Sequence, residues 1–408
     1  MFALRLALIA LRSLESHFLR SLLATLGVLI GVGSVVACMS ILEGATNQIM
    51  SNFESLGSNL IFVQPSVARI QGRVVGRAQT LMPDDARVIQ REMGDEVKAV
   101  AAQAAGTALV KYFQKSDTYS VVATSSEWFE MNDYRAAAGK VLDDSSSDDE
   151  LSQVVCLGAE VAERLFGGMD PVGQTIKLRN AAYRVIGTME ERGNIGFLDA
   201  DKTVYIPIRS GLKRFFNRPY LDLLTVQVSD EPGVDIDKVK KKLEQVMRAA
   251  HKIRPGQDDD FEVDTLDETI DTVSQATLIF KVVFYSIAGI SLVVGGIGIM
   301  NIMLVSVTER TREIGVRMAV GARRGDILLQ FLVEALIISL LGGGFGLLLG
   351  MMFSDLLDKV LQGMFTTEIT PTVIITALLT TTVVGVFSGL YPAYKASRLD
   401  PVEALRYE

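Results

Sequence analysis

The sequence predicts a membrane protein with four transmembrane α-helices and a large α/β (α+β) domain outside the membrane. Four stretches are long and apolar enough to cross a bilayer, which takes about 20 residues at about 1.5 Å per residue. A long polar segment, residues 43–277, separates the first stretch from the second. The composition agrees with this mixture, because 49% of the residues are hydrophobic and 22% are charged.

The predicted spans are almost free of charge. They cover residues 21–42, 282–308, 327–354 and 369–394. Glu334 is the only charged residue within them. The run from Val35 to Cys38 resembles a lipoprotein processing site, but the apolar stretch continues past the cysteine. We therefore expect the first span to remain as a membrane anchor rather than to be cleaved.

The orientation follows from basic residues near the ends of the spans. Arginine and lysine are concentrated in residues 1–20, 309–326 and 395–408, whereas the connection between the third and fourth spans has only Lys359. Because short cytoplasmic loops carry the excess of positive charge, we expect these three segments in the cytoplasm and residues 43–277 outside. The chain should then lie in the cell inner (plasma) membrane with both termini cytoplasmic.

Residues 1–20 have a helical pattern of their own. Apolar residues from Leu4 to Phe18 recur at spacings of three and four, and arginines cluster on the other side. This pattern is typical of an amphipathic helix on the cytoplasmic face of a membrane. An early start of the first transmembrane helix is the alternative.

The two ends of the external segment repeat one pattern. Its order is strand, helix, strand at each end: residues 60–63, a helix opened by Pro83 and residues 97–105, then residues 223–228, 235–250 and 261–263. We expect these ends, residues 43–114 and 220–277, to be two halves of one domain.

The middle of the external segment, residues 115–219, is predicted to be an inserted subdomain. Its strand patterns cover residues 119–123, 154–157, 175–178, 183–186 and 203–206. The acidic run at residues 143–150 is predicted to be a solvated loop without metal, because it lacks the ligand spacing and glycine turn of a calcium loop.

The sequence contains no pattern that predicts catalysis. It has no Walker A motif, and its two histidines, His17 and His251, lie in segments expected on opposite sides of the membrane. The two cysteines lie in unrelated segments and predict no disulfide framework. The net charge of −8 and the absence of a basic stripe argue against nucleic-acid binding. We therefore expect a non-catalytic chain with no catalytic residue, metal or cofactor of its own.

The segment at residues 309–326 is the most informative. Up to Val320 it predicts a short helix, in which Glu313 and Arg317 pair one turn apart and Gly321 ends the helix. Ile314 and Met318 would form an apolar strip suited to a groove on a cytoplasmic partner. A solvated connector that merely satisfies the positive-inside rule is the alternative.

Two features within the spans suggest close helix packing. Glycines recur four residues apart in the first, third and fourth spans, a spacing that lets helices approach closely: Gly27 and Gly31, Gly342, Gly346 and Gly350, and Gly385 and Gly389. Asn301 and Glu334 lie at similar depth in antiparallel spans, so one hypothesis is a contact between them. The alternative is that Glu334 reaches the cytoplasmic interface.

Three stretches resemble the permeases of the MacB, LolC/LolE and FtsX superfamily. The string ERTREIGVRMAVGA at residues 309–322 carries the most specific likeness. The matching residues, which the resemblance assigns to ATPase coupling, are Glu309, Arg310, Glu313, Ile314, Gly315, Arg317, Met318, Ala319, Gly321 and Ala322. The tail resembles the C-terminal signature of the superfamily at Pro392, Arg398, Pro401, Leu405 and Arg406. Residues 155–187 look like its periplasmic core domain.

The resemblance implies partners that composition does not show. It implies an ABC transporter permease that forms a homodimer, or pairs with a second permease, and binds a separate ATPase subunit that carries ATP and Mg²⁺. ATP-driven motion would pass to the periplasmic domain by mechanotransmission, with a membrane-fusion adaptor and an outer-membrane channel as further partners. The domain would have the split porter and inserted sabre arrangement. A lipoprotein-release permease and an FtsX-like signalling protein that controls an external hydrolase are the alternatives.

Overall fold

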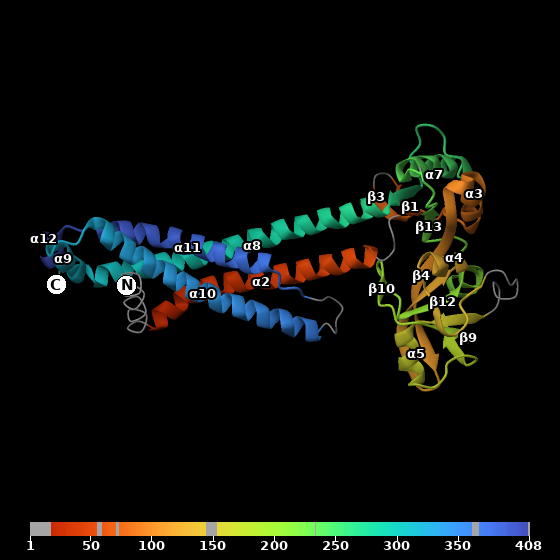
Figure 1. Cartoon of the computed structure of the whole chain (residues 1–408), viewed down its shortest axis with the longest axis horizontal. Coiled ribbons are helices and arrows are strands. Elements are labelled where there is room, and N and C mark those ends of the chain that lie inside the picture. Colours follow the sequence, from red (N-terminus) through yellow and green to blue (C-terminus); the bar gives the residue numbers. More distant parts are fainter. Residues whose placement is uncertain are drawn as a thin grey trace. The chain divides into compact units, whose positions relative to one another are not determined.

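The computed structural model describes residues 18–54, 59–70, 73–143, 153–232, 234–360 and 367–406. The chain divides into two compact units (Figure 1). Residues 1–48 and 273–408 form the helical unit, and residues 49–272 form the sheet unit. Most of the predicted amphipathic helix at residues 1–20 lies outside the described residues, as does most of the acidic run at residues 143–150.

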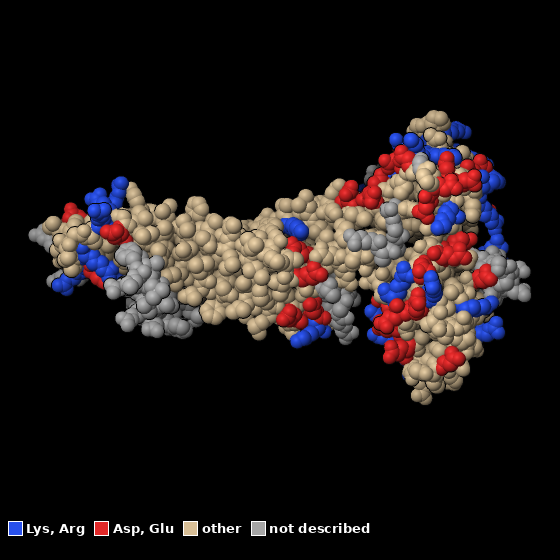
Figure 2. Space-filling view, viewed as in Figure 1, with Lys and Arg blue, Asp and Glu red and all other residues tan. Residues whose placement is uncertain are grey.

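The helical unit contains four helices long and apolar enough to cross a membrane. They are α2 (Phe18–Glu54), α8 (Leu266–Glu309), α10 (Arg324–Val360) and α11 (Pro371–Ser397). On the face in view in Figure 2, charged side chains of this unit lie near its two ends, and the surface between them has none. Helices α2, α8 and α10 each contain a predicted span, and α11 covers the fourth span except for its first two residues, which confirms the predicted membrane-helical class.

Glycines set the spacing between these helices. A Cβ on Gly27 of α2 would lie 2.7 Å from the Cα of Gly295 on α8, and one on Gly346 of α10 would lie 2.6 Å from the carbonyl oxygen of Leu29. On α11, a Cβ on Gly389 would meet the Cβ of Ala335 at 2.5 Å. Distances this short exclude a side chain, so the close packing predicted from the glycine spacing is confirmed.

The sheet unit is built on one mixed sheet in the order β14-β1-β13-β4-β5-β12-β7-β9-β6, with β8 paired to β4 and β9. The strands are β1 (Leu60–Pro65), β4 (Val97–Tyr112), β5 (Lys115–Thr124), β6 (Ala136–Gly139), β7 (Val154–Leu157), β8 (Thr175–Leu178), β9 (Ala181–Met189), β12 (Thr203–Pro207), β13 (Leu223–Val228) and β14 (Phe261–Thr265). Two small ribbons complete it: β2 (Val67–Ile70) with β3 (Arg73–Arg77), and β10 (Asn194–Ile195) with β11 (Leu198–Asp199).

One long strand joins the two ends of this sheet. Residues 97–103 of β4 pair with β13, and residues 103–112 pair with β5. The predicted strand at residues 97–105 was therefore too short, because β4 continues to Tyr112. Through its pairing with β13, β4 belongs to the domain predicted from residues 43–114 and 220–277. Through its pairing with β5, it also belongs to the predicted insert at residues 115–219.

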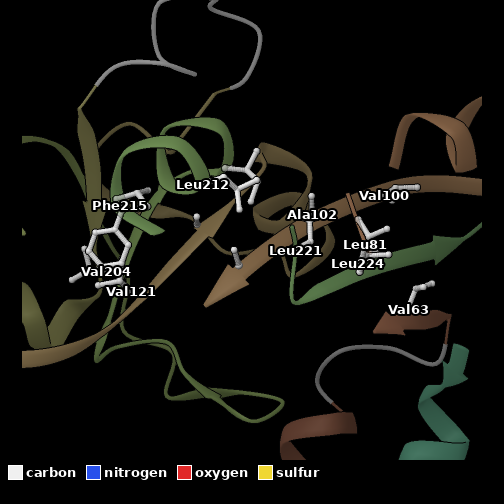
Figure 3. Packing of buried hydrophobic residues seen from close by; sticks show 14 of the residues in the cluster. Val63, Leu81, Val100, Ala102, Val121, Val204, Leu212, Phe215, Leu221 and Leu224 are labelled. Carbon is white, nitrogen blue, oxygen red and sulfur yellow. The ribbon is translucent and has the colours of Figure 1, made fainter. Parts of the chain in front are cut away.

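Helices cover the sheet and bury its core. They are α3 (Pro83–Met93), the 3₁₀ turn η1 (Gly94–Glu96), α4 (Ser126–Met131), α5 (Ala159–Phe166), α6 (Ile208–Ser210) and α7 (Ile236–Ala250), and the π-helical turn η2 (Gly211–Phe216). Figure 3 shows Leu212 and Phe215 of η2 pointing into the same apolar core as Val121 and Val204 of the sheet. The sequence patterns missed α4, α5 and η2, which are too short for their periodicity to stand out.

Candidate functional site

A short helix, α9 (Thr311–Ala319), interrupts the path from α8 to α10. The break is at Arg310, whose φ of −106° and ψ of 16° depart from helical values. The helix ends before Gly321, which has a φ of +106°, a conformation that suits glycine. The short helix predicted from residues 309–320 is thus present, with bounds shifted by one or two residues.

The burial of α9 corrects one part of the sequence interpretation. Ile314 is 1% exposed and lies in the apolar core of the helical unit, and Met318 packs against that core. Neither forms the partner-facing strip that we expected. The apolar side chains on the outer face are Val316, which is 46% exposed, and Val320, which is 85% exposed. Sequence periodicity found the apolar face of α9, but could not tell whether its own bundle or a partner covers it.

Two arginine contacts join α9 and the break before it to α10. Arg310 donates to the carboxylate of Glu334 across 3.5 Å, and Arg317 donates to Gln330 Oε1 across 2.8 Å. Gln330 and Glu334 are four residues apart and therefore lie on one face of α10. Arg317 also pairs with Glu313, as predicted from their spacing.

The contact predicted between Asn301 and Glu334 is replaced by this arrangement. Glu334 is 4% exposed and lies against Arg310, whereas the Asn301 side chain is exposed on α8. A carboxylate buried among apolar helices needs a strong partner, and a guanidinium satisfies it better than an amide does. The position of a residue along a span gives its depth in the membrane. It does not give the side of the helix on which the side chain lies.

The C-terminal signature lies beside α9. Pro392 is buried inside α11, Arg398 stacks on the ring of Tyr394, and Asp400 caps the short helix α12 (Pro401–Arg406). A Cβ on Gly315 of α9 would lie 2.7 Å from the Cβ of Ala404 on α12. Figure 1 shows α9 and α12 together at one end of the helical unit. Leu405 of α12 is exposed.

The residues predicted to couple an ATPase thus divide into two groups. The residues that hold α9 in place are Ile314, Met318 and Gly315, which pack on the bundle and α12, and Arg310 and Arg317, which contact α10. Glu309, Glu313, Ala319, Gly321 and Ala322 are exposed or partly exposed and form the accessible surface with Val316 and Val320. Exposed Arg312, Arg323 and Arg324 make this end of the unit basic.

A second polar cluster lies in the sheet unit. His251, after α7, has one ring nitrogen 2.8 Å from Asp260 and the other 3.2 Å from Asp85 of α3. The hydrogen bonds to Asp85 and Asp260 raise the pKa of His251 above its ordinary value, against the opposing effect of burial. Among the described residues, no group of three or more His, Cys, Asp or Glu side chains is placed to hold a metal ion.

Comparison with known proteins assigns the chain to a family. The MacB-like periplasmic core domain matches residues 21–246, and the FtsX-like permease C-terminal domain matches residues 285–401. The chain belongs to the MacB-like permease family. Its helical unit contains α9 and α12, and its sheet unit contains most of the periplasmic core domain of the family.

Two relatives of this MacB-like chain have the same name. "Macrolide export ATP-binding/permease protein MacB" of Bdellovibrio bacteriovorus is 36% identical over 400 residues, which cover 97% of this chain and 61% of that protein. The protein of the same name from Chlorobaculum tepidum is 37% identical over 401 residues, covering 98% of this chain and 61% of that protein. The MacB-like chain therefore spans about three fifths of the length of these relatives.

Two solved structures are similar to about half of the chain. The crystal structure of the periplasmic region of MacB from Actinobacillus actinomycetemcomitans is 20% identical, with a TM-score of 0.46, and covers 56% of this chain and 98% of that one. The extracellular domain of the transporter YknZ from Gram-positive bacteria is 19% identical, with a TM-score of 0.41, and covers 51% of this chain and all of that one.

Proposed function

We propose that this MacB-like chain is the permease subunit of an ABC transporter that exports a substrate from the periplasm. An ATPase outside these 408 residues binds ATP and Mg²⁺, docks on α9 from the cytoplasm and drives the motion. The basic residues around α9 and α12 favour a cytoplasmic position for this end. The names of the relatives, which combine ATP binding with a permease, support the pairing.

The observation that carries this proposal is the way α9 is built. Its inner face is fixed by Ile314 in the bundle core and by two arginine contacts to α10, while Val316 and Val320 remain exposed. An exposed apolar pair on a firmly held helix suits a groove on a partner, because few side chains need to be ordered on binding. A solvated connector would need no such anchoring.

The helices supply a route for motion from α9. Because Arg310 and Arg317 contact α10, a displacement of α9 would also move α10. The glycine contacts join α10 to α2. Both α2 and α8 are continuous helices whose far ends belong to the sheet unit. A tightly packed bundle moves as discrete elements rather than deforming smoothly, which favours mechanotransmission.

The remaining partners are expected from the family. We propose that two copies pair in the membrane and that the periplasmic unit contacts a membrane-fusion adaptor and an outer-membrane channel. Lipoprotein release uses the same mechanics, and so does FtsX-like signalling to an external hydrolase. The relatives named for macrolide export favour efflux over both.

The decisive experiment is co-purification of the chain with a candidate ABC ATPase subunit from the same genome. Val316→Asp with Val320→Asp should abolish co-purification and ATPase stimulation, because two charges would then face an apolar groove. Membrane insertion should stay normal. Val67→Asp, at an exposed valine of β2 in the sheet unit, is the matched control and should leave the complex intact. Undiminished recovery of the ATPase with the α9 variant would remove α9 as its docking site.

A further inference from the structure

A hollow of about 590 Å³ opens on the sheet unit between the start of α3 and the π-helical turn η2. Met82 and Pro83 line it on one side, and Leu212 and Pro219 line it on the other. The two sides are tied together beneath it, where the Leu221 amide donates to the Leu81 carbonyl across 2.8 Å. Figure 3 shows Leu81, Leu212 and Leu221 among the buried hydrophobic residues of the sheet unit.

The wall formed by η2 is strongly basic. From Thr203 to Leu221 the sequence has no Asp or Glu, and its four charged residues are all cations: Arg209, Lys213, Arg214 and Arg218. Three of them, all except Arg214, line the hollow. This bias is local, since the whole chain carries a net charge of −8. The hollow therefore combines an apolar floor with a rim that carries three cations and one carboxylate, Asp84 of α3, which pairs with Arg87 outside the lining.

The cations that line the hollow differ in how firmly other side chains hold them. Arg218 is held by the rings of Phe216 and Tyr220, at 4.9 and 4.6 Å, and by an ion pair with Asp222. Lys213 is exposed and has no acidic partner within the part of the chain that the structure describes. A fixed guanidinium beside a free ammonium leaves positive charge available to a ligand.

The turn that presents these cations is unusual. A π-helical turn is rare, and such turns occur often at functional sites. Here it is pressed onto the sheet, because a Cβ on Gly211 would lie 2.3 Å from the Cβ of Ala123. It ends at Asn217, a residue with a φ of 52° that also lines the hollow. The turn thus projects Lys213 and Asn217 outward while Leu212 and Phe215 stay buried.

We propose that this hollow binds an acidic segment of an extracytoplasmic protein, with carboxylates at the basic rim and a neighbouring apolar side chain on the floor. Charge complementarity selects the acidic class. Arg209, Lys213 and Asn217 are exposed, so one side of the hollow is open to solvent. An open site fits a segment of a larger partner, whereas small-molecule sites bury most of their ligand. The inference rests on the sheet unit lying outside the membrane and not on transport.

The test is a peptide-display selection on the full chain in lipid nanodiscs, followed by fluorescence anisotropy with the selected peptides. The expected peptides carry Asp or Glu beside a leucine or an aromatic residue. Lys213→Glu should weaken their binding at least tenfold, and Lys213→Gln should have an intermediate effect. Raised salt should weaken binding to the unaltered chain.

Lys241→Glu supplies the matched control, because Lys241 is an exposed lysine on α7 that does not line the hollow. It should bind the peptides like the unaltered chain. Three results would overturn the proposal: no selected peptide, peptides without acidic residues, or equal loss of binding in the two charge-reversal variants. All three can be distinguished from failure of the ATPase proposal, since the selection needs neither ATP nor the ATPase.

Discussion

Arg310 Nη1 lies 3.5 Å from Glu334 Oε1, at the point where α8 breaks and α9 begins. Glu334 is almost fully buried, while the Arg310 side chain is 24% exposed. The pair joins the break before α9 to α10. It also explains how a carboxylate is accommodated within a predicted span, since a buried charge needs a partner of opposite sign.

Removing one member of this pair should destabilise the helical unit. Arg310→Ala removes the guanidinium that contacts the buried carboxylate, a loss of about 3 kcal/mol for a fully buried pair and less here because the arginine is partly exposed. Glu334→Leu should cost less, since an apolar side chain suits its surroundings. The double variant should lose less unfolding free energy than the two single variants lose in total. Thermal unfolding in detergent measures all three, and additive losses would contradict the pair.

A larger side chain at Gly315 would test the packing of α12 on α9. Gly315→Leu places a side chain where the Cβ position already lies 2.7 Å from Ala404, so α12 should be displaced at a cost of about 1–3 kcal/mol. ATPase stimulation should fall with it. Gly325→Leu, at a glycine with no heavy atom within 4 Å of an added Cβ, is the control. Limited proteolysis of the C-terminal tail, faster in the first variant only, is the measurement.

Two glycines of α10 provide a matched pair for the bundle. Gly346→Ala should lower the unfolding temperature, because its Cβ would meet the Leu29 carbonyl at 2.6 Å and push α10 away from α2. Gly344→Ala has open space around its Cβ and should be neutral or slightly stabilising. Equal effects of the two changes would show that α2 and α10 do not pack through Gly346.

His251 should make the stability of the sheet unit depend on pH. Its raised pKa means that the charged ring stabilises the fold fully below the ordinary histidine pKa of about 6.5. This stabilisation is lost as the pH rises through the higher pKa of the folded state. His251→Asn should therefore cost about 2 kcal/mol at pH 6, where two charge-assisted hydrogen bonds are lost, and clearly less at pH 9. Unfolding midpoints across this range, with Lys241→Glu as control, give the comparison.

Much of the architecture could be predicted because it follows from the types and spacing of neighbouring residues. The apolar runs around Gly346 and Ala377 had to be membrane helices, since a bilayer requires their length and polarity. Strand β7 and helix α7 were located closely from their periodicity. Helix α5 and the turn η2 were missed, because elements of a single turn or two carry too little pattern.

The candidate site was predicted in part. Residues 309–322 were found by their likeness to a family, and the helix ends at Arg310 and Gly321 agree with local signals. The roles of Ile314 and Met318 were assigned to the wrong surface. The same apolar strip fits a partner or the helix's own bundle, and periodicity does not distinguish the two.

The sequence by itself determined how many helices cross the membrane, where the external domain begins and ends approximately, and which short helix lies between two spans. Hydrophobicity and local spacing are properties of neighbouring residues, so they are visible without a fold. Only the tertiary structure decided that Glu334 meets Arg310 rather than Asn301 and that Gly315 lies against Ala404. Such contacts depend on the rotation of each helix about its axis, and that rotation is set by packing between distant parts of the chain.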